Sequence, residues 1–301
     1  METSGRHYAI LEARGLVEAA GPDVRPFLQG MVSADVDKLS PERALWAAFL
    51  TPQGKFLHEF FLTLDPGPEA GEDRVLLDCE AARLDDLRTR LGRYKLRARV
   101  TLEDVSARYA VAAVFGAGAL EALGLPAQAG RAAPFAGGLV HVDPRLPALG
   151  ARAVLPRADA EAALQGAGFA PAGPADYDAL RIRLGVPDGS RDLEVERATL
   201  LENGFDELGG IDWDKGCFMG QELTARTKYR GLVKKRLVPV EIDGPAPEPG
   251  TPVTADGKDV GVLRSTADGL GLALIRLEHL EAPLSAGAAR LTVRKPDWMK
   301  V

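Results

Sequence analysis

The residues best suited to do chemistry form one short run, Lys215-Gly216-Cys217-Phe218-Met219-Gly220-Gln221-Glu222. The thiol of Cys217 follows the ammonium group of Lys215 by two residues, and a nearby cation lowers the pKa of a thiol. Gly216 and Gly220 carry no side chains, so backbone can come close to the sulfur. Because the thiolate is the nucleophile and the metal ligand, this pattern predicts a functional thiol.

A helix is expected to begin just after this run, near Gln221 or Glu222, and to end at Tyr229 with Gly231 as its left-handed terminator. The N-terminus of a helix favours negative charge and lowers the pKa of a neighbouring thiol further. Attack on a substrate, ligation of a metal and redox sensing by Cys217 all stay open on these residues.

The same segment is strongly basic, although the chain of 301 residues has a formal net charge of −6. Between Lys215 and Arg236 seven basic residues stand against one acid, Glu222. The basic residues are Lys215, Arg226, Lys228, Arg230, Lys234, Lys235 and Arg236. Such a local excess predicts an anionic ligand, a carboxylate or a phosphate. The amide of Gln221 and the carboxylate of Glu222 could bind a polar heterocycle. A helix cap and a solvated linker are the simpler interpretations of these residues, and both stay open.

Other side chains with catalytic potential do not form a recognisable set. The four histidines, which lack zinc-ligand spacing and the pattern of a cysteine hydrolase, are His7, His58, His141 and His279. No metal site is therefore predicted. Cys79 ends an apolar stretch and is expected to be a buried structural residue. The chain also lacks a glycine-rich phosphate loop and a Gly-x-Ser-x-Gly elbow, so nucleotide hydrolysis and serine-hydrolase chemistry are unsupported.

Composition indicates an ordinary soluble globular protein, with 46% hydrophobic and 27% charged residues. The net negative charge argues against general nucleic-acid binding. Two distant cysteines suit a reducing compartment. The N-terminus does not read as a secretory signal, and no apolar stretch reaches the ~20 residues of a membrane span. Together these features predict a cytoplasmic location.

Periodicity predicts an α+β fold followed by a small antiparallel β-barrel. Two apolar runs within residues 45–64 flank a turn at residues 51–55 and predict a hairpin. Residues 75–102 predict a strand, a helix with Leu84, Leu87 and Leu91 on its buried face, and a strand over 95–102. After Gly231 short strands alternate with Gly/Pro turns. Residues 1–236 are accordingly assigned to two intertwined α/β subdomains, and residues 237–301 to the barrel.

The run Lys215 to Glu222 resembles the central motif of the folate-binding family related to the glycine-cleavage T-protein, an aminomethyltransferase. It is most similar to the YgfZ-type branch, whose members help to mature iron–sulfur proteins. Residues 221–227 are especially like the mitochondrial iron–sulfur assembly factor of that branch. Further similar segments are Phe27-Leu28-Gln29-Gly30, Ser33-Ala34-Asp35-Val36, Phe49-Leu50-Thr51-Pro52-Gln53-Gly54-Lys55, Leu180-Arg181-Ile182-Arg183-Leu184-Gly185-Val186-Pro187, Arg191-Asp192 and Lys234-Lys235-Arg236-Leu237.

The resemblance implies a T-protein-like ring of domains that holds tetrahydrofolate. It also implies a non-enzymatic or weakly enzymatic role in assembling or repairing iron–sulfur clusters, with client enzymes and assembly proteins as partners. Cys217 would be the functional thiol, and the basic segment would receive the glutamate tail of the folate. The implied folate contacts are Lys215, Gly216, Gln221, Glu222, Arg226, Lys228 and Arg230.

An alternative is a folate-dependent aminomethyltransferase or demethylase that acts on a small amine donor. The T-protein carries a glutamate in an Arg-Leu-Glu-Ala-Gly stretch, where this chain has Arg183. Its catalytic aspartate corresponds to Asp85 only by an ungapped count, and Asp85 and Asp86 also fit the solvated face of a helix. A third interpretation is a folate-independent interaction protein that kept the fold.

Overall fold

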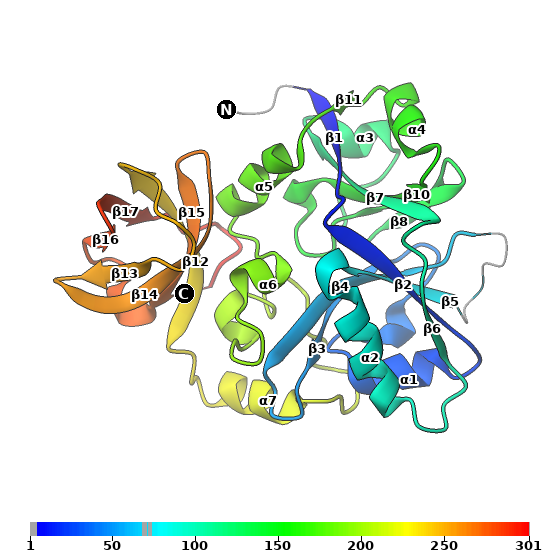
Figure 1. Ribbon diagram of the computed structural model, residues 1–301, viewed down its shortest axis with the longest axis horizontal. Helices are drawn as coiled ribbons and strands as arrows, with labels where there is room; N and C mark the ends of the chain where they lie inside the picture. Colours follow the sequence, from blue (N-terminus) through cyan, green and yellow to red (C-terminus); the bar gives the residue numbers. More distant parts are fainter. Residues whose placement is uncertain (1–4, 68–70, 72–73, 301) are drawn as a thin grey trace. The chain divides into compact units, whose positions relative to one another are not determined.

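The computed structural model describes residues 5–67, 71 and 74–300, which fold into two compact units (Figure 1). The first unit comprises Met1–Phe49, His58–Tyr177 and Gly209–Met219. The second comprises Leu50–Leu57, Asp178–Leu208 and Gly220–Val301. The chain therefore passes between the units several times. No helix in the described part of the chain is long and apolar enough to cross a membrane.

One sheet of the first unit has five strands in the order β3-β4-β5-β2-β6. Their bounds are β2 Arg14–Ala20, β3 Leu45–Leu50, β4 Phe56–Leu64, β5 Arg74–Glu80 and β6 Thr101–Asp104. Helix α1 spans Val24–Met31, and helix α2 spans Leu84–Tyr94 and packs against β2 and β6. Leu84, Leu87 and Leu91 form the buried face of α2, as their helical spacing predicts.

A second sheet of the same unit has the order β11-β1-β7-β10-β9-β8. Its strands are β1 Arg6–Ile10, β7 Tyr109–Gly116, β8 Ala132–Phe135, β9 Gly138–Val142, β10 Ala151–Pro156 and β11 Ala170–Pro171. Apolar side chains of this sheet pack with helices α3 (Ala119–Ala122) and α4 (Ala160–Gly166), and Val114, Val140 and Leu155 lie in that core.

The second unit contains a closed barrel with the strand order β12-β15-β14-β13-β16-β17. The strands are β12 Lys235–Asp243, β13 Pro252–Ala255, β14 Lys258–Ala267, β15 Leu270–Arg276, β16 Leu284–Ala286 and β17 Ala289–Val293. The other helices are α5 Pro174–Arg183, which links the units, α6 Gly189–Asp192 and α7 Gln221–Tyr229. Short 3-10 turns are η1 Val36–Lys38, η2 Ala81–Arg83, η3 Pro147–Leu149, η4 Leu201–Asn203 and η5 Leu277–His279.

A buried ion pair joins three elements of the second unit. The guanidinium group of Arg181 on α5 donates to Asp192 Oδ2 at 2.6 Å and to Ser265 Oγ of β14 at 3.1 Å. Ser265 in turn donates to Asp192 Oδ1 at 2.5 Å. Because each polar group has a partner, the burial of these charges is tolerated. Two of the segments that carry the family resemblance, those that contain Arg181 and Asp192, thus have a structural role.

The predicted α+β class and the C-terminal barrel are confirmed. The predicted strand over 95–102 is wrong, because α2 continues through Tyr94 and β6 begins only at Thr101. Between them Leu96 has a φ of +44°, which interrupts any extended path. The first strand of the barrel begins at Lys235, but the boundaries of the two compact units lie at other positions. The domain boundary at residue 236 and the ring of domains therefore stay predictions.

Candidate functional site

The loop that carries Cys217 is anchored to the last turn of α1 and to the chain segment that follows it, within the first unit. Ser33 Oγ donates to the carbonyl oxygen of Gly210 at 2.5 Å, and Asp212 N donates to Ser33 O at 2.9 Å. Beyond the cysteine, Met219 N donates to Gly30 O at 3.0 Å. The loop is therefore fixed both before and after the thiol.

Lys215 provides the strongest of these anchors. Its buried ammonium group donates to the carbonyl oxygens of Gln29 at 2.8 Å, Val32 at 2.7 Å and Ala34 at 2.7 Å. It also lies 5.2 Å from the centre of the Phe218 ring. Burial lowers the pKa of Lys215 to about 8. Three carbonyl oxygens use the three donors of the ammonium group, so the structure gives Lys215 an anchoring role in place of the expected pairing with the thiol.

The two cysteines lie in opposite environments. Cys217 is exposed, whereas Cys79 on β5 is buried, and burial raises the pKa of the Cys79 thiol to about 12. The predicted structural role of Cys79 agrees with this burial. Among the described residues, no three His, Cys, Asp or Glu side chains gather into a metal-binding group.

Helix α7 begins at Gln221, with Gly220 as its N-cap, and Gly231 follows its end with a φ of +60°. These bounds confirm the predicted helix. The two glycines that flank the thiol differ in their surroundings. A Cβ on Gly220 would lie 2.6 Å from Thr51 O and 2.9 Å from Gly54 Cα, whereas a Cβ on Gly216 would meet nothing within 4 Å. Close packing against the 51–55 turn therefore requires glycine at position 220 only.

Most of the predicted cationic contacts are already engaged within the protein. On α7, Arg226 pairs with Glu222, one turn earlier, and both lie on the surface. Arg230 and Lys234 are exposed. The electropositive segment is thus weaker than the sequence alone suggests, because acids from the same helix and from the preceding loop neutralise part of it.

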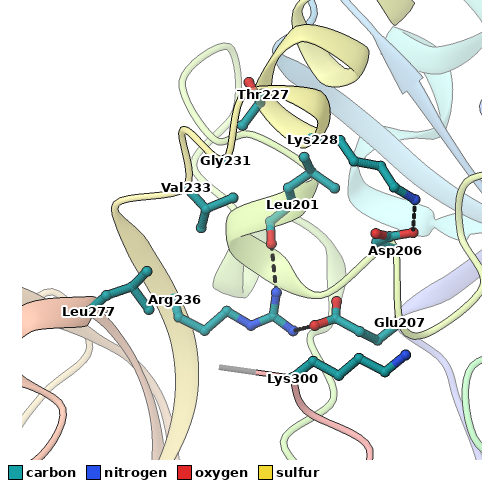
Figure 2. Close-up of a pocket in the computed structure, with 10 residues that line it drawn as sticks. All are labelled: Leu201, Asp206, Glu207, Thr227, Lys228, Gly231, Val233, Arg236, Leu277 and Lys300. Atoms are coloured by element: carbon teal, nitrogen blue, oxygen red, sulfur yellow. Dashed lines mark hydrogen bonds and ion pairs between the residues drawn. The ribbon is translucent and has the colours of Figure 1, made fainter.

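A cavity of about 430 Å³ opens beside this segment in the second unit (Figure 2). Lys228 pairs with Asp206 at 3.1 Å, and the buried Arg236 pairs with Glu207 at 2.8 Å. Lys300 lies beside them and forms no ion pair with the part of the chain that the structure describes. The lining residues are Leu201, Asp206, Glu207, Thr227, Lys228, Gly231, Val233, Arg236, Leu277 and Lys300. Three cations and two acids on apolar walls suit a ligand with a carboxylate.

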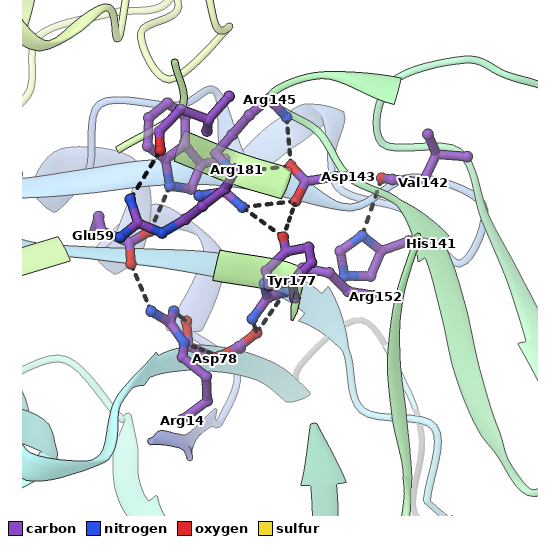
Figure 3. A network of polar contacts seen from close by, with 12 residues as sticks. Arg14, Glu59, Asp78, His141, Val142, Asp143, Arg145, Arg152, Tyr177 and Arg181 are labelled. Atoms are coloured by element: carbon purple, nitrogen blue, oxygen red, sulfur yellow. Dashed lines mark hydrogen bonds and ion pairs between the residues drawn. The ribbon is translucent and has the colours of Figure 1, made fainter. Parts of the chain in front are cut away.

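A second polar cluster, which the sequence did not predict, is buried in the first unit (Figure 3). Arg14 donates to Asp78 at 2.7 Å and to Glu59 at 2.7 Å, and Arg152 donates to Asp78 at 2.6 Å. Burial alone would raise the pKa of Asp78, but the two guanidinium groups hold it below its usual value. The Arg152 guanidinium also stacks 4.0 Å from the centre of the Phe61 ring. Asp78 is therefore committed to structure.

The cluster continues through Asp143, which accepts from Arg145 at 2.8 Å and from the hydroxyl group of Tyr177 at 3.3 Å. Arg145 lies 4.8 Å from the Phe61 ring centre. Its members come from distant parts of the chain, so spacing could not reveal them. The one available signal was the presence of Arg14, Asp78 and Arg152 inside otherwise apolar strands.

The residues linked to the transferase alternative do not come together as a catalytic site. The Asp85 side chain is 90% exposed and pairs with Arg88 at 3.1 Å. Asp86 accepts from His58 Nε2 at 2.9 Å and also pairs with Arg90. Asp85 thus lies on the solvated face of α2, as one interpretation of the sequence holds, whereas Asp86 is half-buried against His58.

Comparison with known proteins relates most of the chain to one group. The mouse (Mus musculus) mitochondrial iron–sulfur cluster assembly factor IBA57 is 33% identical over 96% of this chain and 84% of its own length. The human (Homo sapiens) protein of the same name is 34% identical over 98% of this chain and 86% of its own length. The chain belongs to the IBA57 family. The family resemblance read from residues 215–222 is thereby confirmed.

The family model described as the CAF17 C-terminal β-barrel domain matches residues 234–301 of this IBA57-family chain. The IBA57 homologue of Mycosarcoma maydis is 35% identical over 75% of this chain, which spans 55% of that relative. All three relatives are named as mitochondrial proteins, so the predicted cytoplasmic location is wrong on this comparison.

The fold of the IBA57-family chain is also that of a solved structure. The glycine cleavage system aminomethyltransferase T from Bartonella henselae superposes with a TM-score of 0.79, covering 99% of this chain and 87% of that one. Sequence identity is 16%, so the match concerns the fold alone. The predicted T-protein-like fold is confirmed.

Proposed function

We propose that the chain supports the assembly or repair of iron–sulfur clusters in client enzymes, with Cys217 as its functional thiol. The observation that carries this proposal is the relationship to proteins named iron–sulfur cluster assembly factors, over nearly the whole chain. The exposed thiol on an anchored loop supports it, because thiolates are the natural ligands of iron–sulfur clusters.

The anchored loop presents Cys217 as a ready ligand. Lys215 and Met219 hold the loop on either side of the thiol, so little ordering is needed when a cluster arrives. One thiol cannot hold a cluster alone. The remaining ligands would come from a client enzyme, an assembly protein or a second copy of this chain, and the cluster would be cargo.

Binding of tetrahydrofolate is a further part of the proposal, and the likeness to the aminomethyltransferase fold supports it. The contacts expected from the sequence do not form a ready pterin cradle, since Lys215 is bound to carbonyl oxygens and Glu222 pairs with Arg226. The acidic tail of a folate fits better, because Lys228, Arg236 and Lys300 line the 430 Å³ cavity. These cations would bind carboxylates there.

Calorimetric titration of the reduced protein with tetrahydrofolate tests this part separately. Saturable binding by the wild type and by Cys217→Ser would support a folate site apart from the thiol. Absence of heat with both proteins would reject folate binding and leave the thiol function untouched.

Aminomethyl transfer is the second candidate, and the shared fold is the observation in its favour. It requires folate-dependent turnover of a methylamine or aminomethyl donor that survives Cys217→Ser and is lost in Asp85→Asn. The surface position of Asp85 counts against that outcome.

Deletion of the gene in its natural host tests the main proposal. Enzymes that depend on iron–sulfur clusters should lose activity in the deletion strain while their protein levels persist, and the wild-type gene should restore their activity. Unchanged activity of these enzymes in the deletion strain would contradict the proposed function.

A further inference from the structure

A second strongly basic stretch lies in the first unit, away in sequence from Cys217. Every charged residue from position 88 to position 99 is basic. The six are Arg88, Arg90, Arg93, Lys95, Arg97 and Arg99. They occupy the end of α2 and the turn between α2 and β6 (Figure 1). The proposed cluster-assembly function makes no use of this stretch.

Half of these cations have acidic partners and half do not. The paired ones are Arg88 with Asp85, Arg90 with Asp86 and Arg99 with Asp23. The side chains of Arg93, Lys95 and Arg97 make no hydrogen bond or ion pair with residues 5–67, 71 and 74–300. Since Arg93 and Arg97 are exposed as well, the tip of the turn carries uncompensated positive charge.

Leu96 stands in the middle of these three cations. It is 88% exposed, and Tyr94 beside it is 38% exposed. Among the described residues the exposed large hydrophobic side chains are Tyr94, Leu96, Tyr229 and Leu232, and Leu96 is the most exposed of them. Its φ of +44° is unfavourable for a leucine by about 1 kcal/mol. Leu96 thus combines a strained backbone with a side chain that contributes little to the core, and such strain concentrates at functional sites.

The surrounding fold holds this turn in one shape. The Tyr94 ring packs edge-on against Phe49, with centroids 6.3 Å apart. Ala98 N donates to Lys95 O at 2.7 Å, which closes the turn around Leu96. The apolar tip is therefore presented in a fixed position, and a partner would bind it with little loss of conformational entropy.

We propose that the turn from Arg93 to Arg97 is a docking surface for a partner protein that presents acidic side chains around an apolar recess. Arginine is one of the residue types that carry much of the binding energy in protein interfaces. Complementary charge steers such an encounter and fixes its orientation. The site does not depend on Cys217 or on folate, so it stands apart from the proposed cluster chemistry.

The observations favour a protein over a membrane or a nucleic acid. Even a single myristoyl chain gives only marginal membrane binding, and this turn offers one leucine on a chain with a net charge of −6. Nucleic-acid binding would draw on stacking, but the Tyr94 ring is already engaged with Phe49.

Photo-crosslinking in the natural host identifies the occupant. The photoreactive residue p-benzoylphenylalanine is placed at position 96, and at the exposed Thr89 of α2 in a control. We expect a protein adduct from position 96 that is absent from position 89. The captured protein is then purified and its affinity for the full chain is measured, because capture alone does not support the proposal.

Two matched variants give the decisive comparison. Leu96→Asn removes the apolar tip and suits a left-handed backbone, so it should fold at least as well as the wild type. Leu232→Asn removes an exposed leucine from the second unit as a control. Leu96→Asn and Arg97→Gln should each weaken binding of the captured protein about tenfold or more, and Leu232→Asn should not.

Several results would overturn the proposal. One is the absence of any protein adduct specific to position 96. Equal affinity of the captured protein for the wild type and for Leu96→Asn is another. Leu96-dependent sedimentation with phosphatidylserine vesicles would replace it with a membrane contact, and an RNA adduct from position 96 would replace it with a nucleic-acid contact.

Discussion

The ammonium nitrogen of Lys215 lies 2.7 Å from the carbonyl oxygen of Val32, the residue that caps the C-terminal end of α1. The last carbonyl groups of a helix lack partners within the helix and carry partial negative charge, so a buried lysine is well placed among them. The lysine that the sequence suggested as an activator of Cys217 thus anchors the loop on which Cys217 lies.

Replacement of Lys215 by methionine should destabilise the protein. The variant leaves the carbonyl groups of Val32 and Ala34 buried without this donor, at a cost of about 2 kcal/mol in the free energy of unfolding. Urea denaturation measures the change. The control is Lys228→Met, which removes a half-exposed ion pair with Asp206 and should cost less than about 1 kcal/mol. Equal effects of the two substitutions would contradict the anchoring role.

The two glycines beside the thiol should respond differently to alanine. Gly220→Ala places a Cβ 2.6 Å from Thr51 O in a backbone with φ of +77°, so we expect a loss of about 2 kcal/mol in unfolding free energy. Gly216→Ala meets no atom within 4 Å and should change stability by less than about 0.5 kcal/mol. Thermal unfolding of the pair checks this, and a larger effect at Gly216 would show that the loop is packed differently.

Stability should fall in mild acid because of His141. Burial, reinforced by the positive charge of Arg152, lowers the pKa of His141 from 6.5 to about 4. Between these values the unfolded chain binds a proton that the folded protein does not, so stability is full above pH 6.5 and declines as pH falls toward 4. From pH 7 to pH 5 the wild type should lose about 2 kcal/mol more than His141→Asn in urea unfolding. Parallel losses in both proteins would contradict this assignment.

The two thiols should differ in their reactivity in the native protein. Ellman's reagent should modify only Cys217 in the native protein, because Cys79 is buried and its pKa is raised to about 12. In denaturant both thiols should react. Mass spectrometry locates the adducts, and rapid native labelling of Cys79 would show that β5 opens readily.

Local pattern in the sequence was enough for the barrel, for α7 and for the buried face of α2, since each follows from short-range spacing. It failed at residues 95–102, where cations and apolar residues alternate as in a strand. There the strained Leu96 lies in a surface turn, so the alternation of cations and apolar residues does not mark the two faces of a strand. The ionic contacts could not be read in advance, because Arg14, Asp78 and Arg152 meet only after three strands have assembled.

The sequence predicted which elements form the candidate site, but it did not predict the ionic contacts within that site. The sequence located the thiol loop and the helix after it, but charge counting could not show that Asp206 and Glu207 neutralise Lys228 and Arg236. The positive charge that is available to a ligand is known only when the fold shows which acids lie beside the basic segment.

The most direct test of the central claim is replacement of the chromosomal gene by its Cys217→Ser variant, with Cys79→Ser as the matched control. The activity of iron–sulfur enzymes is then measured beside the level of the variant protein. We predict that Cys217→Ser lowers these activities to those of the deletion strain while Cys79→Ser, once folded, preserves them. Full activity with Cys217→Ser would contradict the assignment of Cys217 as the functional thiol.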